Sequence, residues 1–419
     1  MLSLFEIAAA LLVLSAIFGW INERYIGLPH VIGLLVMALL SSIALLVFDH
    51  FLPWLGVQDA VAATLVEIDF YDTMMNGMLA FLLFAGALQV DLGRLRAEAW
   101  AVGSMATVGV VISTFVVGFG FYFLAGLFGV DVPLIWALVF GALISPTDPV
   151  AVLALLKSVS LPQRVEVKIA GESLFNDGVG IVVFTILLGA AVTGSDFSLG
   201  EGARLFAIEA GGGIAIGLVF GWLGYRAMRS MDEYALEVLI SLAVVMGGYA
   251  LCTQLHVSGP LAMAVAGLLI GNHGVTFAMS DVTRDYVIKF WELIDELLNS
   301  ILFLLIGLEI LIISFVPSLA GLAVATIPLV LFARLVAVSA PLSILSLRRT
   351  FTRGSIPILT WGGVRGGISV ALALAVPASV AREPILMATY AVVIFSIVVQ
   401  GLTITPLVRR LIREDRPPD

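Results

Sequence analysis

The feature that constrains this chain most is a succession of apolar blocks that recurs along nearly its whole length, separated by short loops that hold most of the charge. A helix needs roughly 20 apolar residues to cross the hydrocarbon core of a bilayer, and most blocks reach that length. Of the 419 residues, 61% are hydrophobic and 12% are charged, which leaves too few polar groups to cover a soluble globule. The sequence therefore predicts an all-α integral membrane protein and argues against a nucleic-acid partner.

Glycine, proline and charged residues between the blocks predict about thirteen transmembrane helices. The first block is interpreted as a span and not as a signal peptide, because it has no basic leader and no cleavage site of small residues. The predicted spans cover 2–21, 29–48, 73–90, 98–126, 133–157, 164–192, 203–228, 234–255, 258–272, 286–313, 317–346, 354–378 and 384–411.

The positions of the basic residues predict an orientation for these spans. When the spans are counted in this way, all but four of the 21 Lys and Arg residues fall in or beside connections on one side. Arg204 and Arg382 lie on the opposite side, while Arg334 and Arg365 lie inside spans. Because cytoplasmic loops are rich in Lys and Arg, the N-terminus is predicted outside and the C-terminus in the cytoplasm.

Two of the predicted spans contain residues that interrupt a helix. Span five contains two prolines within 145–149 (Ser-Pro-Thr-Asp-Pro), and span twelve contains four glycines within 361–367 (Trp-Gly-Gly-Val-Arg-Gly-Gly). Paired broken helices are typical of a transporter site. The interrupted spans are seven apart and thus run in opposite directions, which favours inverted repeats with two discontinuous crossing helices. Ordinary packing kinks are the alternative.

Span six contains two carboxylates, Glu172 and Asp177. A charged side chain near the middle of a bilayer costs about 2.5 to 3.5 kcal/mol, so each acid needs a partner or a function. At 100° per residue Ser173 shares a helix face with Asp177, whereas Glu172 points roughly 140° away. The two acids are therefore predicted to have different roles. Arg334 and Arg365 are the available counter-charges, and the sequence leaves their pairing open.

Asp177 is the candidate ion-binding group. Together with Ser173 and the break at Thr147 and Asp148, it offers carboxylate, hydroxyl and carbonyl oxygens, which small hard cations prefer. Burial penalises the bare carboxylate, so a proton and a cation compete for it, and an empty charged site crosses an apolar barrier poorly. Asn176 adds an amide without charge, so a single titrating acid favours one cation for one proton.

Three motifs carry a resemblance to a known family. The segments 145–153 (Ser-Pro-Thr-Asp-Pro-Val-Ala-Val-Leu), 171–178 (Gly-Glu-Ser-Leu-Phe-Asn-Asp-Gly) and 361–369 (Trp-Gly-Gly-Val-Arg-Gly-Gly-Ile-Ser) resemble the sodium/proton exchanger family, close to its NhaP-type branch of monovalent cation:proton antiporters. The resemblance runs from about the first span to the last. It implies a multi-pass transporter of the cell inner or plasma membrane that is not an enzyme, needs no cofactor and forms a homodimer. The activity it implies is exchange of Na⁺, and also Li⁺, for H⁺ in pH homeostasis, by elevator-like alternating access.

The resemblance also implies a division into domains. Residues 1–93 and 201–313 would form an interface domain for dimerisation, and residues 97–195 and 317–413 a moving core that transports the ion. Residues 414–419 would be a short cytoplasmic tail.

Roles for the polar residues of the core follow from the same resemblance. The residues that bind or organise the cation and the proton would be Asp177, Ser173, Thr147, Asp148 and Asn176, with Na⁺ on Asp177, Ser173 and Thr147. Structural support would come from a pair between Glu172 and Arg334, and from Arg365 at the break in span twelve.

The resemblance bears on stoichiometry and on ion selectivity. In the family an Asn-Asp pair, here Asn176 and Asp177, marks electroneutral exchangers. Many relatives carry an acid in span three where this chain has Ala85. The choice between Na⁺ and K⁺ therefore stays open, and a K⁺/H⁺ exchanger on the same scaffold is the first alternative. A cation channel with a fixed central site is the second.

Overall fold

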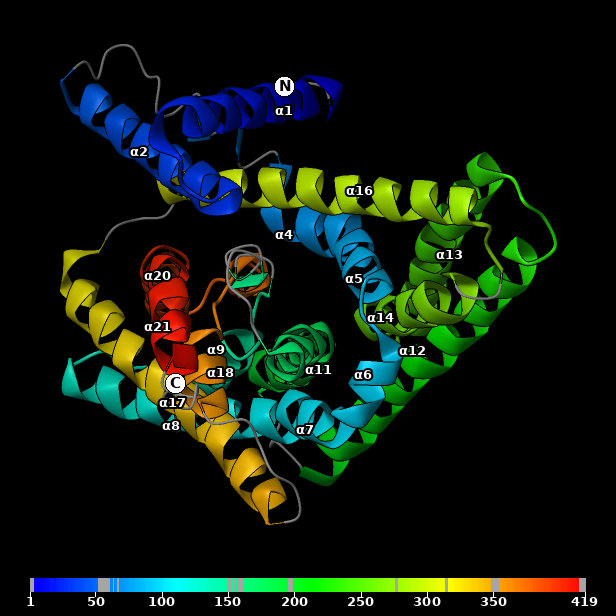
Figure 1. Cartoon of the computed structure of the whole chain (residues 1–419). Helices are drawn as coiled ribbons and strands as arrows, with labels where there is room; N and C mark the ends of the chain where they lie inside the picture. Colours follow the sequence, from blue (N-terminus) through cyan, green and yellow to red (C-terminus); the bar gives the residue numbers. More distant parts are fainter. Residues whose placement is uncertain are drawn as a thin grey trace.

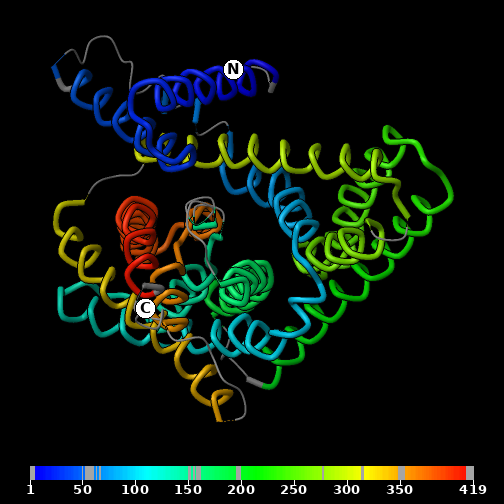
Figure 2. Tube along the Cα trace, viewed as in Figure 1, coloured from blue at the N-terminus to red at the C-terminus, as the bar shows by residue number. Residues whose placement is uncertain are grey.

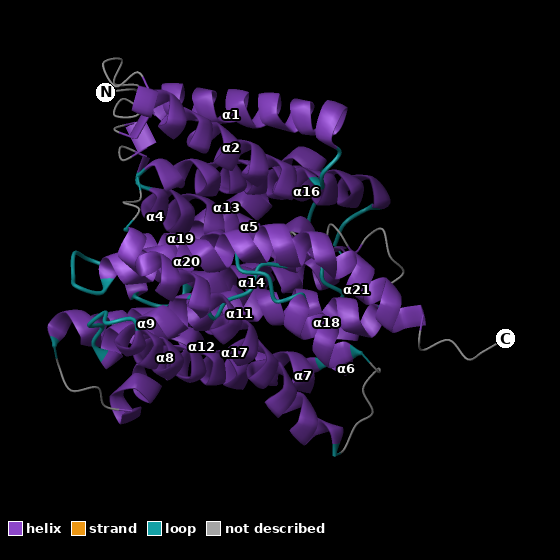
Figure 3. Ribbon diagram, turned by 90° about the vertical axis from the view of Figure 1, so that its left-hand side faces the viewer, coloured by secondary structure: helices purple, strands orange, loops and turns teal. Residues whose placement is uncertain are grey.

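The computed structural model describes residues 4–51, 61–62, 64–65, 68–149, 152–153, 156, 162–194, 199–275, 278–312, 316–347 and 354–413. Over these residues the chain is helical and has no strand, and Figure 3 shows the helices stacked in layers. Nine helical stretches of the described part are long and apolar enough to cross a membrane. The prediction of an all-α membrane protein is confirmed.

The helices begin and end close to the limits of the apolar blocks. In chain order they are α1 (Leu4–Ile21), α2 (His30–Phe51), α4 (Phe70–Asp72), α5 (Leu79–Leu88), α6 (Leu92–Ala97), α7 (Ala99–Ser104), α8 (Val110–Leu127), α9 (Leu134–Leu143), α11 (Gln163–Thr193), α12 (Leu199–Met228), α13 (Tyr234–Leu255), α14 (Gly259–Leu269), α16 (Asp281–Leu308), α17 (Ala320–Ser346), α18 (Ser355–Trp361), α19 (Gly367–Leu374), α20 (Arg382–Phe395) and α21 (Gly401–Arg413). Short π-helical turns join α4 to α5, α7 to α8 and α20 to α21, so each of these pairs forms one continuous stretch.

Local sequence signals explain where several helices begin and end. Ser258 caps α14 and Ser280 caps α16, in each case by accepting a hydrogen bond from a backbone N–H of the first turn. Helix α11 begins directly after Pro162 and ends just before Gly194, which adopts the left-handed conformation that terminates many helices.

The helices pack in two groups with α11 between them. One group, here the α17 group, comprises α8, α9 and α17 to α20; the other, the α14 group, comprises α2, α5, α12, α13, α14 and α16. Helix α11 contacts α9 of the first and α14 of the second. Figure 1 shows α11 end-on near the centre, and Figure 2 shows α12, in green, along the outer edge.

Large apolar side chains lie on the outer surface of this molecule as well as in its core, while several charged groups are buried. Large apolar side chains on the outward face of α12, such as Leu218 and Trp222, are about half exposed, whereas Glu172, Asn176 and Asp177 are buried. Apolar side chains are stable against lipid, and charged groups there face the protein interior. This arrangement agrees with a protein that lies in a bilayer.

Both of the interruptions predicted from the sequence are non-helical. Helix α9 ends at Leu143 and residues 144–149 leave the helix, while 362–366 separate α18 from α19. The two breaks touch, because the Asp148 N–H donates a 2.8 Å hydrogen bond to the carbonyl of Val364. Segments more than 200 residues apart in sequence thus meet beside α11. Part of predicted span five, after residue 149, lies outside the described residues.

Candidate ion-binding site

Helix α11 carries four polar side chains toward the breaks. Glu172, Ser173, Asn176 and Asp177 are all buried, with between 0 and 6% of each residue exposed. Such groups need hydrogen-bond or ionic partners, because an unsatisfied buried polar atom costs about 1 to 3 kcal/mol. The partners of these four residues differ and separate their roles.

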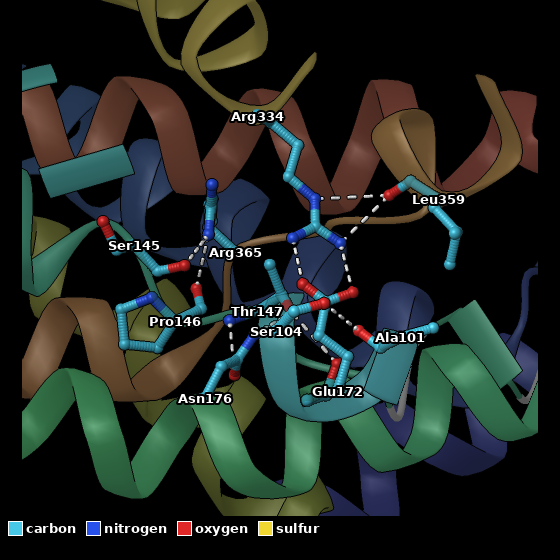
Figure 4. Close-up of polar contacts among 11 residues, drawn as sticks. Ala101, Ser104, Ser145, Pro146, Thr147, Glu172, Asn176, Arg334, Leu359 and Arg365 are labelled. Carbon is cyan, nitrogen blue, oxygen red and sulfur yellow. Dashed lines mark hydrogen bonds and ion pairs between the residues drawn. The ribbon is translucent and has the colours of Figure 1, made fainter. Parts of the chain in front are cut away.

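Thr147, in the first break, is the centre of a neutral oxygen cluster. Its hydroxyl lies 3.0 Å from the Ser173 hydroxyl, and it accepts a 2.8 Å hydrogen bond from the Asn176 amide. The backbone N–H of Thr147 donates to the Asn176 side-chain oxygen at 3.3 Å (Figure 4). Asn176 therefore satisfies the unwound backbone and fixes the Thr147 hydroxyl beside Ser173.

Asp177 differs from its neighbours because part of its carboxylate has no partner. Its Oδ1 atom is buried and makes no hydrogen bond to any described residue. Asp148 and Arg365 are the charged groups that act on it electrostatically. A buried carboxylate oxygen in this state is stabilised when it takes up a proton or a cation. The hydroxyl of Ser173, one turn earlier on α11, supplies a further oxygen on the same face.

Glu172 is fully paired. Its two carboxyl oxygens accept from both terminal nitrogens of the Arg334 guanidinium, one of them at 2.8 Å. Arg334 also donates to the carbonyl of Leu359 in the last turn of α18, at 3.1 and 3.2 Å. Figure 4 shows this fork. Of the two arginines that the sequence offers, the structure thus places Arg334 on Glu172, where it also anchors the end of α18.

Arg365 lies in the second break and binds the first. Its guanidinium donates to the carbonyls of Ser145 and Pro146, the latter at 2.8 Å, just beyond the C-terminus of α9. The resemblance implied that Arg365 supports the break of span twelve, in which it lies. Its side chain instead satisfies the carbonyls of the break in span five. Conversely, Asp148 lies against Gly366 before α19, where a Cβ would collide with its carboxylate. A cation at a helix C-terminus and an anion at an N-terminus both suit the helix dipole.

A second set of polar residues holds the break of span twelve, and sequence reasoning missed it. The Ser396 hydroxyl accepts from the backbone N–H of Arg365 at 2.9 Å and donates to Gln400 at 2.5 Å. The Gln400 amide donates to the carbonyl of Trp361 at 3.0 Å. Ser396 and Gln400 are polar residues four apart in an apolar block, which is the signal that could have identified them.

The chain is similar to known proteins along nearly its whole length. The family model described as "Sodium/hydrogen exchanger, transmembrane" matches residues 11–410. The Na⁺/H⁺ antiporter NhaP of Pseudomonas aeruginosa is 47% identical over 411 residues, which cover 97% of this chain and 96% of that protein. The Na⁺/H⁺ antiporter NhaH of Halobacillus dabanensis is 36% identical over 362 residues, or 85% and 87% of the two chains. The solved structure of the sodium proton antiporter MjNhaP1 from Methanocaldococcus jannaschii superimposes with a TM-score of 0.75 at 20% identity, covering 97% of this chain and 99% of that one, and shows the same fold.

Proposed function

Because the chain belongs to the sodium/hydrogen exchanger family, as an NhaP-type monovalent cation:proton antiporter, we propose that it exchanges Na⁺ for H⁺ at one shared carboxylate, Asp177. It is a multi-pass membrane transporter and not an enzyme. The observation that carries the proposal is the buried Oδ1 atom of Asp177, which has no hydrogen-bond partner among the described residues.

The ligands proposed for Na⁺ are the Asp177 carboxylate and the hydroxyls of Ser173 and Thr147, with Li⁺ as a second substrate. Asn176 and Asp148 organise the site through the bonds described above. Either a proton or a cation neutralises Asp177, whereas the empty site keeps a buried charge. Because a bare carboxylate crosses an apolar barrier at a large cost, the loaded forms move and the empty form stays. Exchange follows without a separate coupling device.

One-for-one exchange is the proposed stoichiometry. Glu172 is neutralised by Arg334, so it does not compete for the transported ion. Asn176 is uncharged, which leaves Asp177 as the titrating acid of α11 at the breaks. A site that alternates between one H⁺ and one Na⁺ transfers no net charge per cycle.

Elevator-like alternating access is proposed for the movement. The α17 group with α11 would be the moving core, residues 97–195 and 317–413, with α9 and α18–α19 as crossing discontinuous helices in inverted repeats. The α14 group with α1 would be the interface domain of a homodimer, residues 1–93 and 201–313. The protein would lie in the inner or plasma membrane of the cell. Its N-terminus would face outward, and its tail, residues 414–419, would lie in the cytoplasm. The close packing of α11 against both groups supports a seam along this helix.

Reconstitution of Asp177→Asn beside the wild-type protein tests the proposal. In proteoliposomes with an imposed pH gradient, addition of Na⁺ or Li⁺ drives proton flux through the wild type and none through Asp177→Asn. Asp285→Asn, at an exposed ion pair with Lys289, is the matched control and transports normally. Cation-driven proton flux that persists in Asp177→Asn would exclude Asp177 as the shared group.

A K⁺/H⁺ exchanger is the alternative that a specific observation keeps open. Ala85 on α5 is fully buried and has no side-chain oxygen to offer a cation. The same assay with K⁺ in place of Na⁺ decides between them. A channel is distinguished by its current: the gradient reached under an imposed membrane potential shifts strongly for a channel and stays unchanged for one-for-one exchange.

A further inference from the structure

Three acids of the described part have buried carboxylate oxygens without a hydrogen-bond partner: Asp177, Glu237 and Glu383. Glu237 is the one in which both oxygens are in this state, and the residue is 0% exposed. The feature that marks Asp177, a buried carboxylate oxygen without a hydrogen-bond partner of ordinary geometry, therefore occurs a second time. Glu237 belongs to α13, in the α14 group, and not to α11.

The surroundings of Glu237 supply hard oxygens and no cation. The Thr283 hydroxyl lies within reach of the Glu237 carboxylate as a hydrogen-bonding group, although not in ordinary hydrogen-bond geometry, and the Asp232 carboxylate adds a like charge. Thr283 is buried in the first turn of α16, and the Ser280 hydroxyl before it lies 3.3 Å from the Thr283 hydroxyl and donates to Asp232 at 2.7 Å. One turn further along α13, Ser241 accepts from the fully buried indole of Trp291 at 2.9 Å. Glu237 thus lies where α13 packs against α16. Figure 1 shows the first turns of α16 beside α13.

The helices packed on α13 do not neutralise Glu237. Helices α5 and α14 contain no ionisable residue, as their sequences show. The basic residue of α16 that is nearest to Thr283 in sequence is Arg284, and it is exposed. Arg226 and Arg229, at the end of α12, are exposed as well. No ion pair to Glu237 occurs among the described residues, and Asp232 adds a like charge. A buried carboxylate without a counter-charge is strongly destabilising when ionised, so the site favours a bound proton or cation.

We propose that Glu237 is a second ion-binding site, which takes up a proton or an alkali cation where α13 meets α16. Oxygen ligands from Glu237, Thr283 and Asp232 fit a small hard cation. In the orientation proposed above, this end of both helices faces the cytoplasm. Because the site lies in the α14 group, apart from the moving core, its occupancy would stabilise the α13–α16 contact and would report on cytoplasmic ions without taking part in the exchange step.

Thermal unfolding in the Asp177→Asn background tests this inference without relying on transport. That substitution removes the transport site, so any ion dependence that remains belongs elsewhere. Unfolding is followed in detergent with NaCl or with choline chloride at constant ionic strength, at about pH 6 and about pH 8.5. We expect Na⁺ to raise the unfolding midpoint by about 2 °C or more at the higher pH, and by less at the lower pH, where the proton occupies the site.

Two further substitutions in that background assign the effect. Glu237→Gln keeps the shape of the side chain but cannot ionise, and is expected to abolish the shift by Na⁺. Glu233→Gln, at the exposed residue one turn earlier whose side chain makes no capping bond, keeps the shift. Absence of any stabilisation by Na⁺ in Asp177→Asn, or a shift that survives Glu237→Gln, would overturn the inference. Either result leaves the role of Asp177 in transport untouched, because that role is judged from proton flux.

Discussion

At the scale of single residues, the site depends on a contrast between two carboxylates five positions apart on α11. Glu172 binds both terminal nitrogens of Arg334, whereas Asp177 keeps a buried oxygen without a partner. An acid that is already paired with an arginine needs no further ion, whereas an unpaired one is stabilised most by taking up a proton or a cation. The contrast supports the proposed division of roles, with Glu172 as structural support and Asp177 as the ion-exchanging acid.

Removing one member of the buried pair should destabilise the protein strongly. Arg334→Met leaves Glu172 buried without a counter-charge, which costs about 3 to 5 kcal/mol, and the double change Glu172→Gln with Arg334→Met should recover much of that loss. The unfolding midpoint in detergent measures both. Asp285→Asn, in a pair that is more than 60% exposed, should change stability by about 1 kcal/mol or less. An Arg334→Met protein as stable as the wild type would contradict the assigned role.

A glycine beside the proposed ion-binding acid sets the distance between α11 and α14. A Cβ atom on Gly178 would lie 2.5 Å from Cγ of Leu261, closer than real side chains approach. Gly178→Ala should therefore cost about 1 to 3 kcal/mol in stability and slow transport, and Leu261→Ala should relieve the effect in the double variant. Gly189→Ala on the same helix, where a Cβ meets no atom within 4 Å, is the control and should be silent. Equal effects of the two alanines would disprove the steric account.

At the scale of elements, two broken helices stabilise each other. The guanidinium of Arg365 satisfies carbonyls at the end of α9, and the N–H of Asp148 binds the carbonyl of Val364. Unwound backbone in a membrane needs such internal partners, because no water is there to replace them. The polar contacts of the breaks are thus a condition for placing carbonyl and hydroxyl oxygens beside Asp177.

The polar pair on the last long helix should be required for this arrangement. Ser396→Ala leaves the buried N–H of Arg365 without its acceptor, which we expect to cost about 1 to 3 kcal/mol and to reduce transport. The measurement is the unfolding midpoint together with Na⁺-driven proton flux. Ser339→Ala, where the exposed hydroxyl bonds only to the carbonyl of Leu335 on its own helix, serves as the control. If the two alanines behave alike, Ser396 does not support the break.

How much the sequence could predict varies with the kind of interaction. The helices and both breaks follow from local signals, namely apolar length, Pro146, Pro149 and the glycines of 361–367. Local signals do not identify the partner of Glu172, because Arg334 and Arg365 are equally available in sequence. Only the packing of α17 on α18 decides between them. Glu237 was missed because an acid near the start of an apolar block is ordinarily exposed, and its burial depends on the distant α16.

At the scale of the whole molecule, α11 lies between a group of helices proposed to move and one proposed to stay. Its contact with α14 passes through Gly178 and Leu261, next to the proposed ion site. A relative movement of the two groups must change this contact, so the contact is the place to detect the movement.

A reversible cross-link at this contact should stop transport. Cys252 is the only cysteine of the chain, so Cys252→Ser gives a background for the pair Gly178→Cys and Leu261→Cys. Oxidation should abolish Na⁺-driven proton flux, and a reducing agent should restore it, because the disulfide fixes α11 against α14. Each single cysteine variant controls for the substitution itself. Full transport by completely cross-linked protein would show that this contact does not move.

The central claim is that Na⁺ and H⁺ compete for the one carboxylate of Asp177, and the apparent KM for Na⁺ as a function of pH tests it most directly. In proteoliposomes with equal pH on both sides, ²²Na⁺ exchange is measured over a range of Na⁺ concentrations at each pH. Competition predicts that KM rises toward tenfold for each unit by which the pH falls, while the rate at saturating Na⁺ is unchanged. A KM that stays constant while the saturating rate falls would contradict the claim, because it would place the proton on a different group.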